Sequence, residues 1–435
     1  MTLDTVRMRQ AIAGARPARV RGRVVHLTGL VVEAVLGGVR HGEVVAIDRS
    51  GREPLLAEVV GLREERAVLL PLGEPTGLGV GADVLPTGRP LFIRAGEALL
   101  GRVLDGLGRP IDARPLPEDL EEWTVERPSP HPLSRRRVTE PLPVGVRAID
   151  GLLTVGEGQR LGLFAGPGVG KSSLLGRIAR GARADLSVVC LVGERGREVR
   201  DFLEESLGPE GLARSVVVVA TSDAPPLVRI KAASVATAVA EWFAERGRRV
   251  LLLLDSLTRL ARAQREAGLA AGELPARHGY PPSVFHLLPR LLERTGNRER
   301  GGITALYTVL VAGGDLDEPI ADEVRSILDG HVVLDRRLAE RGHWPAIDVL
   351  QSLSRVMPAV TGASHRAAAA RVRELLGAYE RQRDLIALGA YRRGADPVTD
   401  AAIERMDAIE TFLRQGPGEG EDLARTVERL AEVVS

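Results

Sequence analysis

Residues 161–173 read Leu-Gly-Leu-Phe-Ala-Gly-Pro-Gly-Val-Gly-Lys-Ser-Ser. The stretch begins as an apolar run, continues through alternating glycines, and ends in a lysine and two serines. This is the Walker A pattern, with alanine at residue 165 where the strict form has glycine. The apolar run predicts a buried strand and residues 171–182 predict a helix, which together form the context that the pattern requires.

The composition of this turn suits the binding of a phosphate chain. Glycine lets successive backbone N–H groups converge on phosphate oxygens, and the following helix adds its positive N-terminal end. Lys171 would reach the β- and γ-phosphates of a nucleoside triphosphate, and the Ser172 hydroxyl would ligate Mg²⁺. A glycine-rich turn without a ligand is the alternative. The predicted phosphate-binding residues are consecutive: Gly166, Pro167, Gly168, Val169, Gly170, Lys171, Ser172 and Ser173.

Two carboxylates stand at the ends of later apolar runs. Asp255 ends the run at residues 251–255, which is typical of the Walker B aspartate that holds Mg²⁺. Glu194 follows the apolar run at residues 188–193. A carboxylate just past the tip of a strand can polarise the attacking water. A solvated, charged loop is the other interpretation of Glu194, because the sequence GERGRE is rich in charge.

The pattern of apolar residues divides the chain into three kinds of structure. Seven short β-type runs between residues 19 and 94 predict a small β-barrel. Residues 101–120 are rich in glycine and proline and are expected to form a connector. Buried strands then alternate with helices, which predicts an α/β core with a mostly parallel sheet. From about residue 358 the pattern is helical, with a break at residues 416–421.

Charge and cysteine content exclude several classes of protein. The chain of 435 residues has 59 basic and 58 acidic residues, and this net charge of +1 argues against a general nucleic-acid or membrane-surface binder. The single cysteine, Cys190, excludes a disulfide framework. No apolar run is long enough to span a membrane, so the protein is expected to be cytoplasmic. Only Lys171 and Lys231 are lysines, and Lys231 is expected to be a solvated helix charge.

Several longer stretches resemble the catalytic subunits of rotary-type ATPases and, within that family, the type III secretion ATPases. GYPPSVF at residues 279–285 and ILDGHVVL at residues 327–334 point to the protein-export branch rather than to ATP synthase. RAIDGLLT looks more like injectisome than flagellar ATPases. The stretches that carry the resemblance include PLPVGVRAIDGLLTVGEGQRLGLFAGPGVGKSS (141–173), LVGERGREVRDFLEESLG (191–208) and ADEVRSILDGHVVLDRRLAERGHWPAIDVLQSLSRVM (321–357).

The resemblance implies roles for residues that match the family's motifs. Glu194 matches the water-activating glutamate, and Arg195 matches the arginine that contacts the γ-phosphate region. Arg355 in SLSRVM matches the arginine finger, which enters the site of the neighbouring subunit. Trp344 in HWPAID stands where the family usually has a tyrosine stacked on adenine, and an indole can also stack. A surface salt bridge for Arg355 and a core position for Trp344 are the alternatives, and the role of Arg259 stays open.

The resemblance also implies the domains and the activity. It suggests an N-terminal helix (1–16) that meets a stator or regulator, a β-barrel oligomerisation domain (17–95), a RecA-like P-loop ATPase core (96–357) and a C-terminal helical domain (358–435) that faces chaperones and substrates. The implied activity is hydrolysis of ATP, with Mg²⁺, by a homohexameric ring. Hydrolysis would power chaperone release, unfolding and export of proteins through a type III secretion system.

The implied partners follow from the same resemblance. They are further copies of the chain, a peripheral-stalk regulator protein, a central-stalk protein and secretion chaperone–effector complexes. Membrane association would be peripheral, through the export apparatus at the cytoplasmic face of the inner membrane, and no nucleic acid is expected.

The sequence leaves other functions open. A flagellar export ATPase and a rotary ATP synthase catalytic subunit share the motifs. A Rho-like nucleic-acid translocase also pairs a barrel with a P-loop core, but such proteins need aromatic platforms, and Phe92 is the only aromatic residue between residues 17 and 93. A non-catalytic nucleotide-binding subunit is disfavoured by Glu194 beside an intact P-loop.

Overall fold

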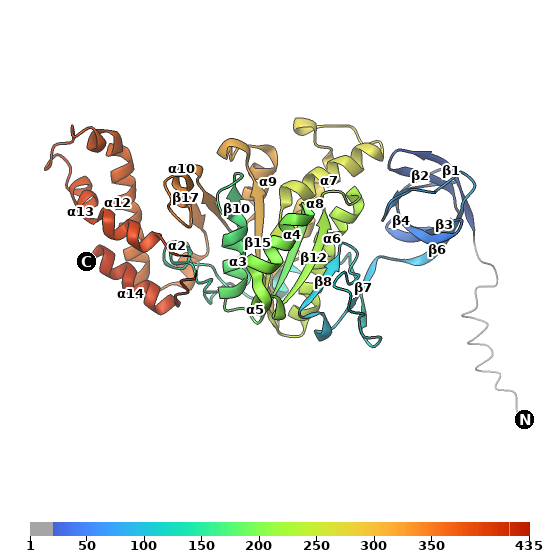
Figure 1. Ribbon diagram of the computed structural model, residues 1–435, viewed down its shortest axis with the longest axis horizontal. Coiled ribbons are helices and arrows are strands. Elements are labelled where there is room, and N and C mark those ends of the chain that lie inside the picture. Colours follow the sequence, from blue (N-terminus) through green and yellow to red (C-terminus); the bar gives the residue numbers. More distant parts are fainter. Residues whose placement is uncertain (1–20, 417) are drawn as a thin grey trace, which may run out of the picture. The chain divides into compact units, whose positions relative to one another are not determined.

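The computed structural model describes residues 21–416 and 418–435, so the helix predicted at residues 1–16 lies outside the described part. The chain divides into two compact units. One unit extends to Leu91 and includes Ala267–Glu273, and the other contains the rest of the chain. Figure 1 shows the elements of both units.

The first unit contains the predicted barrel. Six antiparallel strands close in the order β1-β2-β5-β4-β3-β6, so no strand edge is left open. Alternate apolar side chains such as Val32, Ala34 and Ile47 fill its interior. The strands are β1 Gly22–Thr28, β2 Val31–Val35, β3 Glu43–Arg49, β4 Arg52–Arg63, β5 Arg66–Pro71 and β6 Asp83–Pro90.

Two segments differ from the sequence-based expectation. The seventh β-type run becomes β7 (Phe92–Ala95), which pairs with β9 (Glu121–Thr124) and is not a barrel strand. The expected connector contains β8 (Arg102–Asp105), which extends the main sheet. The buried Arg102 guanidinium holds this segment, because it donates two hydrogen bonds of 2.7 Å to the carboxylate of Asp112. The domain boundaries after residues 16, 95 and 357 stay predictions.

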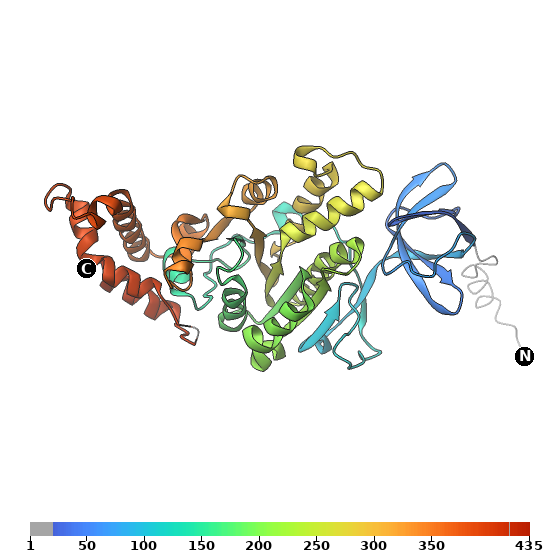
Figure 2. The same cartoon turned by 45° about the horizontal axis from the view of Figure 1, so that its top comes forward.

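The second unit is built on a mostly parallel sheet, as the alternating pattern predicts. Its strands lie in the order β17-β16-β10-β15-β13-β11-β12-β8, with β14 beside β15. Only β14 and β17 run antiparallel to their neighbours. Every residue of β11 is buried, because helices cover both faces of the sheet (Figure 2). The strands are β10 Arg160–Ala165, β11 Leu186–Glu194, β12 Ser215–Thr221, β13 Arg249–Asp255, β14 Gly296–Asn297, β15 Gly302–Leu310, β16 Gly330–Leu334 and β17 Ile347–Ser354.

The helices between these strands complete the α/β core. They are α2 Arg147–Leu152, α3 Lys171–Gly181, α4 Gly196–Asp201, η3 Phe202–Leu207, α5 Gly208–Ala213, α6 Pro226–Glu245, α7 Leu257–Ala270, α8 Pro282–Leu292, α9 Pro319–Ile327, α10 Arg336–Glu340 and α11 Met357–Val360, with short turns η1 Glu97–Leu99, η2 Pro132–Ser134, η4 Arg277–Gly279 and η5 Ala312–Gly314.

Three helices end the chain, as the sequence predicts. They are α12 (Ala363–Ala387), α13 (Pro397–Leu413) and α14 (Leu423–Val434), which pack side by side (Figure 1). Phe412 of α13 lies against Gly151 of α2, where an added Cβ would come within 2.9 Å of the ring. One apolar core therefore continues from the sheet into these helices. Among the described residues, no helix is long and apolar enough to cross a membrane.

Candidate active site

The candidate site lies at the carboxyl edge of the parallel sheet. Strands β10, β13 and β11 run in the same direction, with β15 between β10 and β13. Ala165, Asp255 and Glu194 are their last residues. Because parallel strands end at one edge, the loop after Ala165 and the two carboxylates come together there.

The loop after β10 has the conformation that its glycines allow. Gly168 and Gly170 have φ of 75° and 80°, a region that residues with a side chain rarely adopt. A Cβ added to Gly168 would meet nothing within 4 Å, so the loop is open on that side. Among the described residues, no side chain caps the first turn of α3, which leaves its N–H groups for an anion.

Lys171 lies between the two predicted carboxylates. Its ammonium contacts both carboxylate oxygens of Asp255 and lies 3.5 Å from Oε1 of Glu194. The hydroxyl of Thr308 on β15 donates to Oδ1 of Asp255 at 2.7 Å. The structure therefore brings together Lys171, Glu194 and Asp255, which are 84 residues apart at the extremes in sequence.

Glu194 is buried, with 7% of its surface exposed, and its two oxygens differ. Oε2 lies 2.5 Å from Nη1 of Arg259, which also donates to the carbonyl of Gly193 at 2.6 Å. Oε1 accepts no hydrogen bond from the described residues. Burial, the neighbouring Glu198 carboxyl and the charge of Asp255 raise the pKa of Glu194 to about 7, although Lys171 and Arg259 act in the opposite direction.

These groups fit a nucleoside triphosphate with Mg²⁺. Open glycine backbone and an uncapped helix start suit phosphate oxygens, and the Asp255 carboxylate with the exposed Ser172 hydroxyl is the oxygen donor set that Mg²⁺ prefers. The buried Oε1 of Glu194 has a free lone pair, which a water molecule could occupy.

A cavity of about 790 Å³ lies next to the loop. The indole of Trp344 forms one wall and lies over Gly170, where an added Cβ would come within 2.7 Å of the ring. Trp344 is 43% exposed, which excludes the alternative of a core position. Val169, Leu334 and Ala346 add apolar surface. A cavity of this size with an aromatic wall suits a nucleobase.

The C-terminal segment also lines this cavity, through residues such as Gln415 and Gly416. Gln415 donates its backbone N–H to the carbonyl of Trp344 at 2.8 Å, and its side-chain oxygen accepts from the backbone N–H of Arg147 at 3.0 Å. Arg177 of α3 donates to the carbonyl of Gly416. Thr308, Arg177 and Gln415 are site residues that sequence reasoning missed, since no local pattern marks them.

Two predicted residues do not join the others. The side chain of Arg195 is 77% exposed and lies 3.5 Å from Glu198 rather than in the site. Arg355 is exposed and directly follows β17, whose last residue pairs with Gly330. The next residue of β16, His331, pairs with Gly162 near the start of β10, whereas the phosphate loop follows the end of β10. Arg355 therefore lies toward the opposite edge of the sheet from its own phosphate loop.

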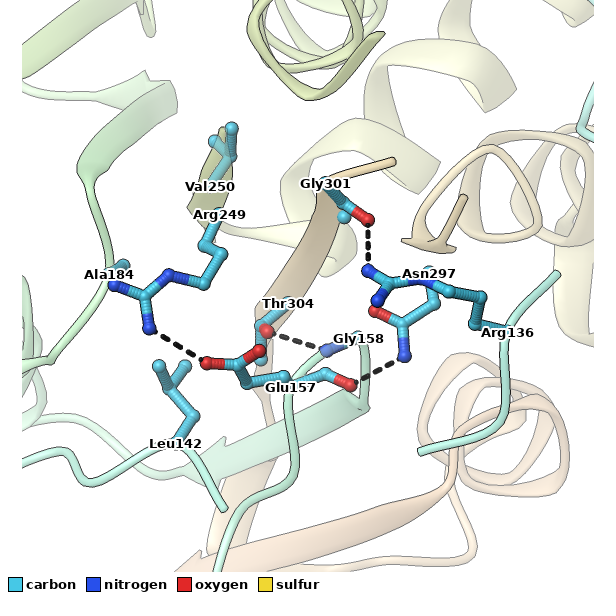
Figure 3. Close-up of a pocket in the computed structure, with 11 residues that line it drawn as sticks. Arg136, Leu142, Glu157, Gly158, Ala184, Arg249, Val250, Asn297, Gly301 and Thr304 are labelled. Carbon is cyan, nitrogen blue, oxygen red and sulfur yellow. Dashed lines mark hydrogen bonds and ion pairs between the residues drawn. The ribbon is translucent and has the colours of Figure 1, made fainter. Parts of the chain in front are cut away.

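A second, smaller cavity lies at that opposite edge (Figure 3). It has a volume of about 10 Å³, room for roughly one water molecule. Its polar groups bond one another: Asn297 donates to the carbonyl of Glu157 at 2.9 Å, and Gly158 donates to the hydroxyl of Thr304 at 2.8 Å. These hydrogen bonds hold the chain before β10 against the sheet. The cavity itself is too small for a nucleotide.

The other lysine is structural. Lys231 on α6 is 5% exposed and lies 3.1 Å from Glu126, so the expectation of a solvated charge is wrong. The reason is that α6 is buried along most of its length against β11, β12 and β13.

Comparison with known proteins agrees with this geometry. The ATP synthase alpha/beta family matches through its β-barrel domain (residues 17–88) and its nucleotide-binding domain (145–354), and the T3SS EscN ATPase C-terminal domain matches residues 361–432. The type 3 secretion system ATPase of Xanthomonas euvesicatoria is 50% identical over 433 residues, 99% of this chain and 98% of that protein. The flagellum-specific ATP synthase of Bacillus subtilis is 50% identical over 414 residues, 95% of this chain and 94% of that protein.

A solved structure gives the same result. The assembled ATPase EscN in complex with its central stalk EscO, from the enteropathogenic E. coli type III secretion system, matches with a TM-score of 0.89 and 46% identity, covering 95% of this chain and 100% of that chain. With its barrel, P-loop core and helical C-terminal domain all matched, the chain belongs to the family of type III secretion and flagellar export ATPases, enzymes that hydrolyse ATP for protein export.

Proposed function

We propose that this protein is the ATPase of an injectisome-type secretion system and that it hydrolyses Mg²⁺-ATP as a homohexameric ring. One observation carries the proposal: Lys171, Glu194 and Asp255 converge on the phosphate loop, whereas Arg355 lies toward the opposite edge of the same sheet. Each pocket would then take its arginine finger from a neighbouring copy.

The residues of one chain would share the work as follows. Lys171 would exchange its contact with Asp255 for the β- and γ-phosphates, and Asp255 with Ser172 would hold the metal. When bound, Mg²⁺ neutralises charge on the phosphate oxygens. Glu194 would accept a hydrogen bond from the attacking water at Oε1, while Arg259 holds Oε2. Arg195 directly follows Glu194 in the chain, and its side chain would turn toward the γ-phosphate when ATP binds.

The base would bind in the cavity beside Trp344. The indole and the apolar residues around it offer a stacking surface, and Gln415 holds the C-terminal wall against that tryptophan. Stacking discriminates poorly between adenine and guanine, so most of the selectivity for the base would come from polar groups at the edges of the cavity.

If each pocket needs an arginine from a neighbouring copy, the active form is a ring of subunits. An arginine finger contributes on the order of 10³–10⁵ in rate, or about 4–7 kcal/mol of barrier. A ring supplies each pocket with Arg355, and the assembled state named for the EscN structure supports such a ring here. The same structure includes a central stalk, which supports a central-stalk partner for this chain.

The proposal of further partners is based on the resemblance to the family. We propose a stator or regulator at the N-terminal end and chaperone–effector complexes at the C-terminal helices, with ATP hydrolysis driving chaperone release and unfolding. The ring would sit at the cytoplasmic face of the inner membrane through contacts with the export apparatus.

Flagellar export is the second candidate, since a flagellar relative is as similar as an injectisome one. Purification of the chain from its own cells distinguishes them: needle-complex components among the copurified proteins support the injectisome, and flagellar components support the alternative.

The ring is tested by turnover at increasing protein concentration, with sedimentation to follow assembly. We expect specific activity to rise with the hexamer population and the Arg355→Ala ring to bind ATP with little turnover. Strictly proportional activity through the assembly range would count against the ring, and a parent protein without turnover would favour a non-catalytic subunit.

A further inference from the structure

The strand that leads to Arg355 contains an irregularity. On β16, His331 and Val333 pair with Leu353 and Asp348 of β17. One residue of β16, Val332, thus lies opposite four residues of β17, so residues 349–352 form a bulge. Bulges bend a strand and change the direction of the side chains that follow. Arg355 comes three residues after this bulge.

The bulge removes backbone carbonyls from the regular ladder, and side chains replace the lost partners. Arg373 of α12 donates from Nη1 to the carbonyl of Val349 at 2.6 Å and from Nη2 to that of Ser352 at 3.1 Å. His331 donates its Nε2–H to the carbonyl of Gln351 at 2.9 Å. Three of the four carbonyls in the bulge are therefore held by side chains.

Arg373 also connects the bulge to helix α2. Its Nη2 donates to the carbonyl of Leu152, the last residue of α2, at 3.2 Å. One guanidinium therefore holds three carbonyls from two segments, a use that its rigid fork of donors permits and a lysine ammonium cannot match. Among the described residues β17 is the outermost strand of the sheet, so only β16 pairs with this stretch there.

We infer that Arg373 is a positioning residue for Arg355: by locking the bulge in β17, it fixes the direction in which the finger leaves the sheet toward the neighbouring subunit. This inference rests on the proposed role of Arg355 in a ring. It also places the support of the finger on the C-terminal helical domain, since α12 carries Arg373.

The first test compares two arginines of α12. Misplacing a catalytic group by about 1 Å costs on the order of 10² in rate, so we expect Arg373→Gln to lower kcat roughly 10- to 100-fold. Arg371→Gln is the matched control, because Arg371 pairs with Glu374 on the same helix, and it should keep full turnover. The affinity of Arg373→Gln for ATP should match that of the parent, since its own phosphate loop is unaltered. Weakened ATP binding would overturn the inference.

The second test separates the finger from the fold by mixing subunits. A Lys171→Ala chain has no working phosphate loop of its own but keeps an intact finger. Added to Arg373→Gln, it would supply that finger to the intact pocket of its neighbour, so turnover of the mixture should exceed the sum of the two parts. A general folding defect in Arg373→Gln would not be rescued in this way.

The same mixture with Arg355→Ala serves as the reference. If Lys171→Ala rescues Arg355→Ala but not Arg373→Gln, the positioning role is wrong while the shared site stands. If it rescues neither, the finger is not donated between subunits, and both the proposed ring mechanism and this inference fail. Arg373→Lys should recover part of the turnover, because one ammonium can hold at most some of the three carbonyls.

Discussion

The indole of Trp344 covers Gly170, close enough that a Cβ on that glycine would lie 2.7 Å from the ring. The aromatic wall of the cavity and the last glycine of the phosphate loop are therefore in direct contact. A nucleotide whose base stacks on Trp344 would therefore place its phosphates in the loop.

Removing the indole should weaken ATP binding without slowing the chemical step. Aromatic stacking contributes about 0.5–1.5 kcal/mol, so Trp344→Ala should raise KM roughly 2- to 10-fold with kcat unchanged. Steady-state kinetics measures both constants. Trp344→Tyr is the control that keeps a stacking ring, and an unchanged KM in Trp344→Ala would show that the base binds elsewhere.

Thr308 should tune the metal site through Asp255. Its hydroxyl donates to Oδ1 of Asp255 at 2.7 Å, and partners of metal-binding carboxylates typically matter 10- to 100-fold for metal affinity. Thr308→Val should therefore raise the Mg²⁺ concentration for half-maximal turnover by roughly tenfold. Thr304→Val is the control. Thr304 lies on the same strand, and its hydroxyl accepts a hydrogen bond from the backbone N–H of Gly158, so this substitution should leave the Mg²⁺ requirement unaltered.

The rate at low ATP should depend on the protonation of Glu194. Burial, Glu198 and Asp255 raise the pKa of this carboxyl to about 7, and the protonated form cannot accept a proton from water. As pH falls through that pKa, kcat/KM should fall, because kcat/KM follows the free enzyme. Glu194→Gln should lose about 10²–10⁴ in kcat and show no such decline. A parent profile that stays flat across neutral pH would contradict this role.

Arg259 should set where that decline occurs. Its guanidinium lies 2.5 Å from Glu194, and its charge lowers the pKa of that carboxyl. Arg259→Gln removes the charge, so the pKa of Glu194 should rise and the decline in kcat/KM should move to higher pH. Arg262→Gln, an exposed arginine on the same helix, should leave the profile in place. An unchanged profile in Arg259→Gln would mean that the pair does not form in the free enzyme.

Much of the site could be predicted because its parts are contiguous in sequence. The phosphate loop joins a strand to a helix over a few residues, and the glycines that it needs are adjacent. Asp255 and Glu194 end apolar runs, and parallel strands end at one edge, so their meeting with Lys171 follows from local pattern and sheet direction. The barrel and the terminal helices follow from apolar periods of two and of 3.6 residues.

Other features could not be predicted, because they depend on contacts between residues far apart in the chain. The burial of Lys231, the inclusion of β8 in the sheet and the contact of Gln415 with Trp344 all require packing that no local period encodes.

The position of Arg355 shows the division most clearly. Its motif predicts an arginine finger, but its separation from its own phosphate loop follows from the register of β17 on β16 and of β16 on β10. Residue order and apolar period are local properties that can be read along the chain. Strand register and the side chains that close a bulge arise only when distant segments pack together.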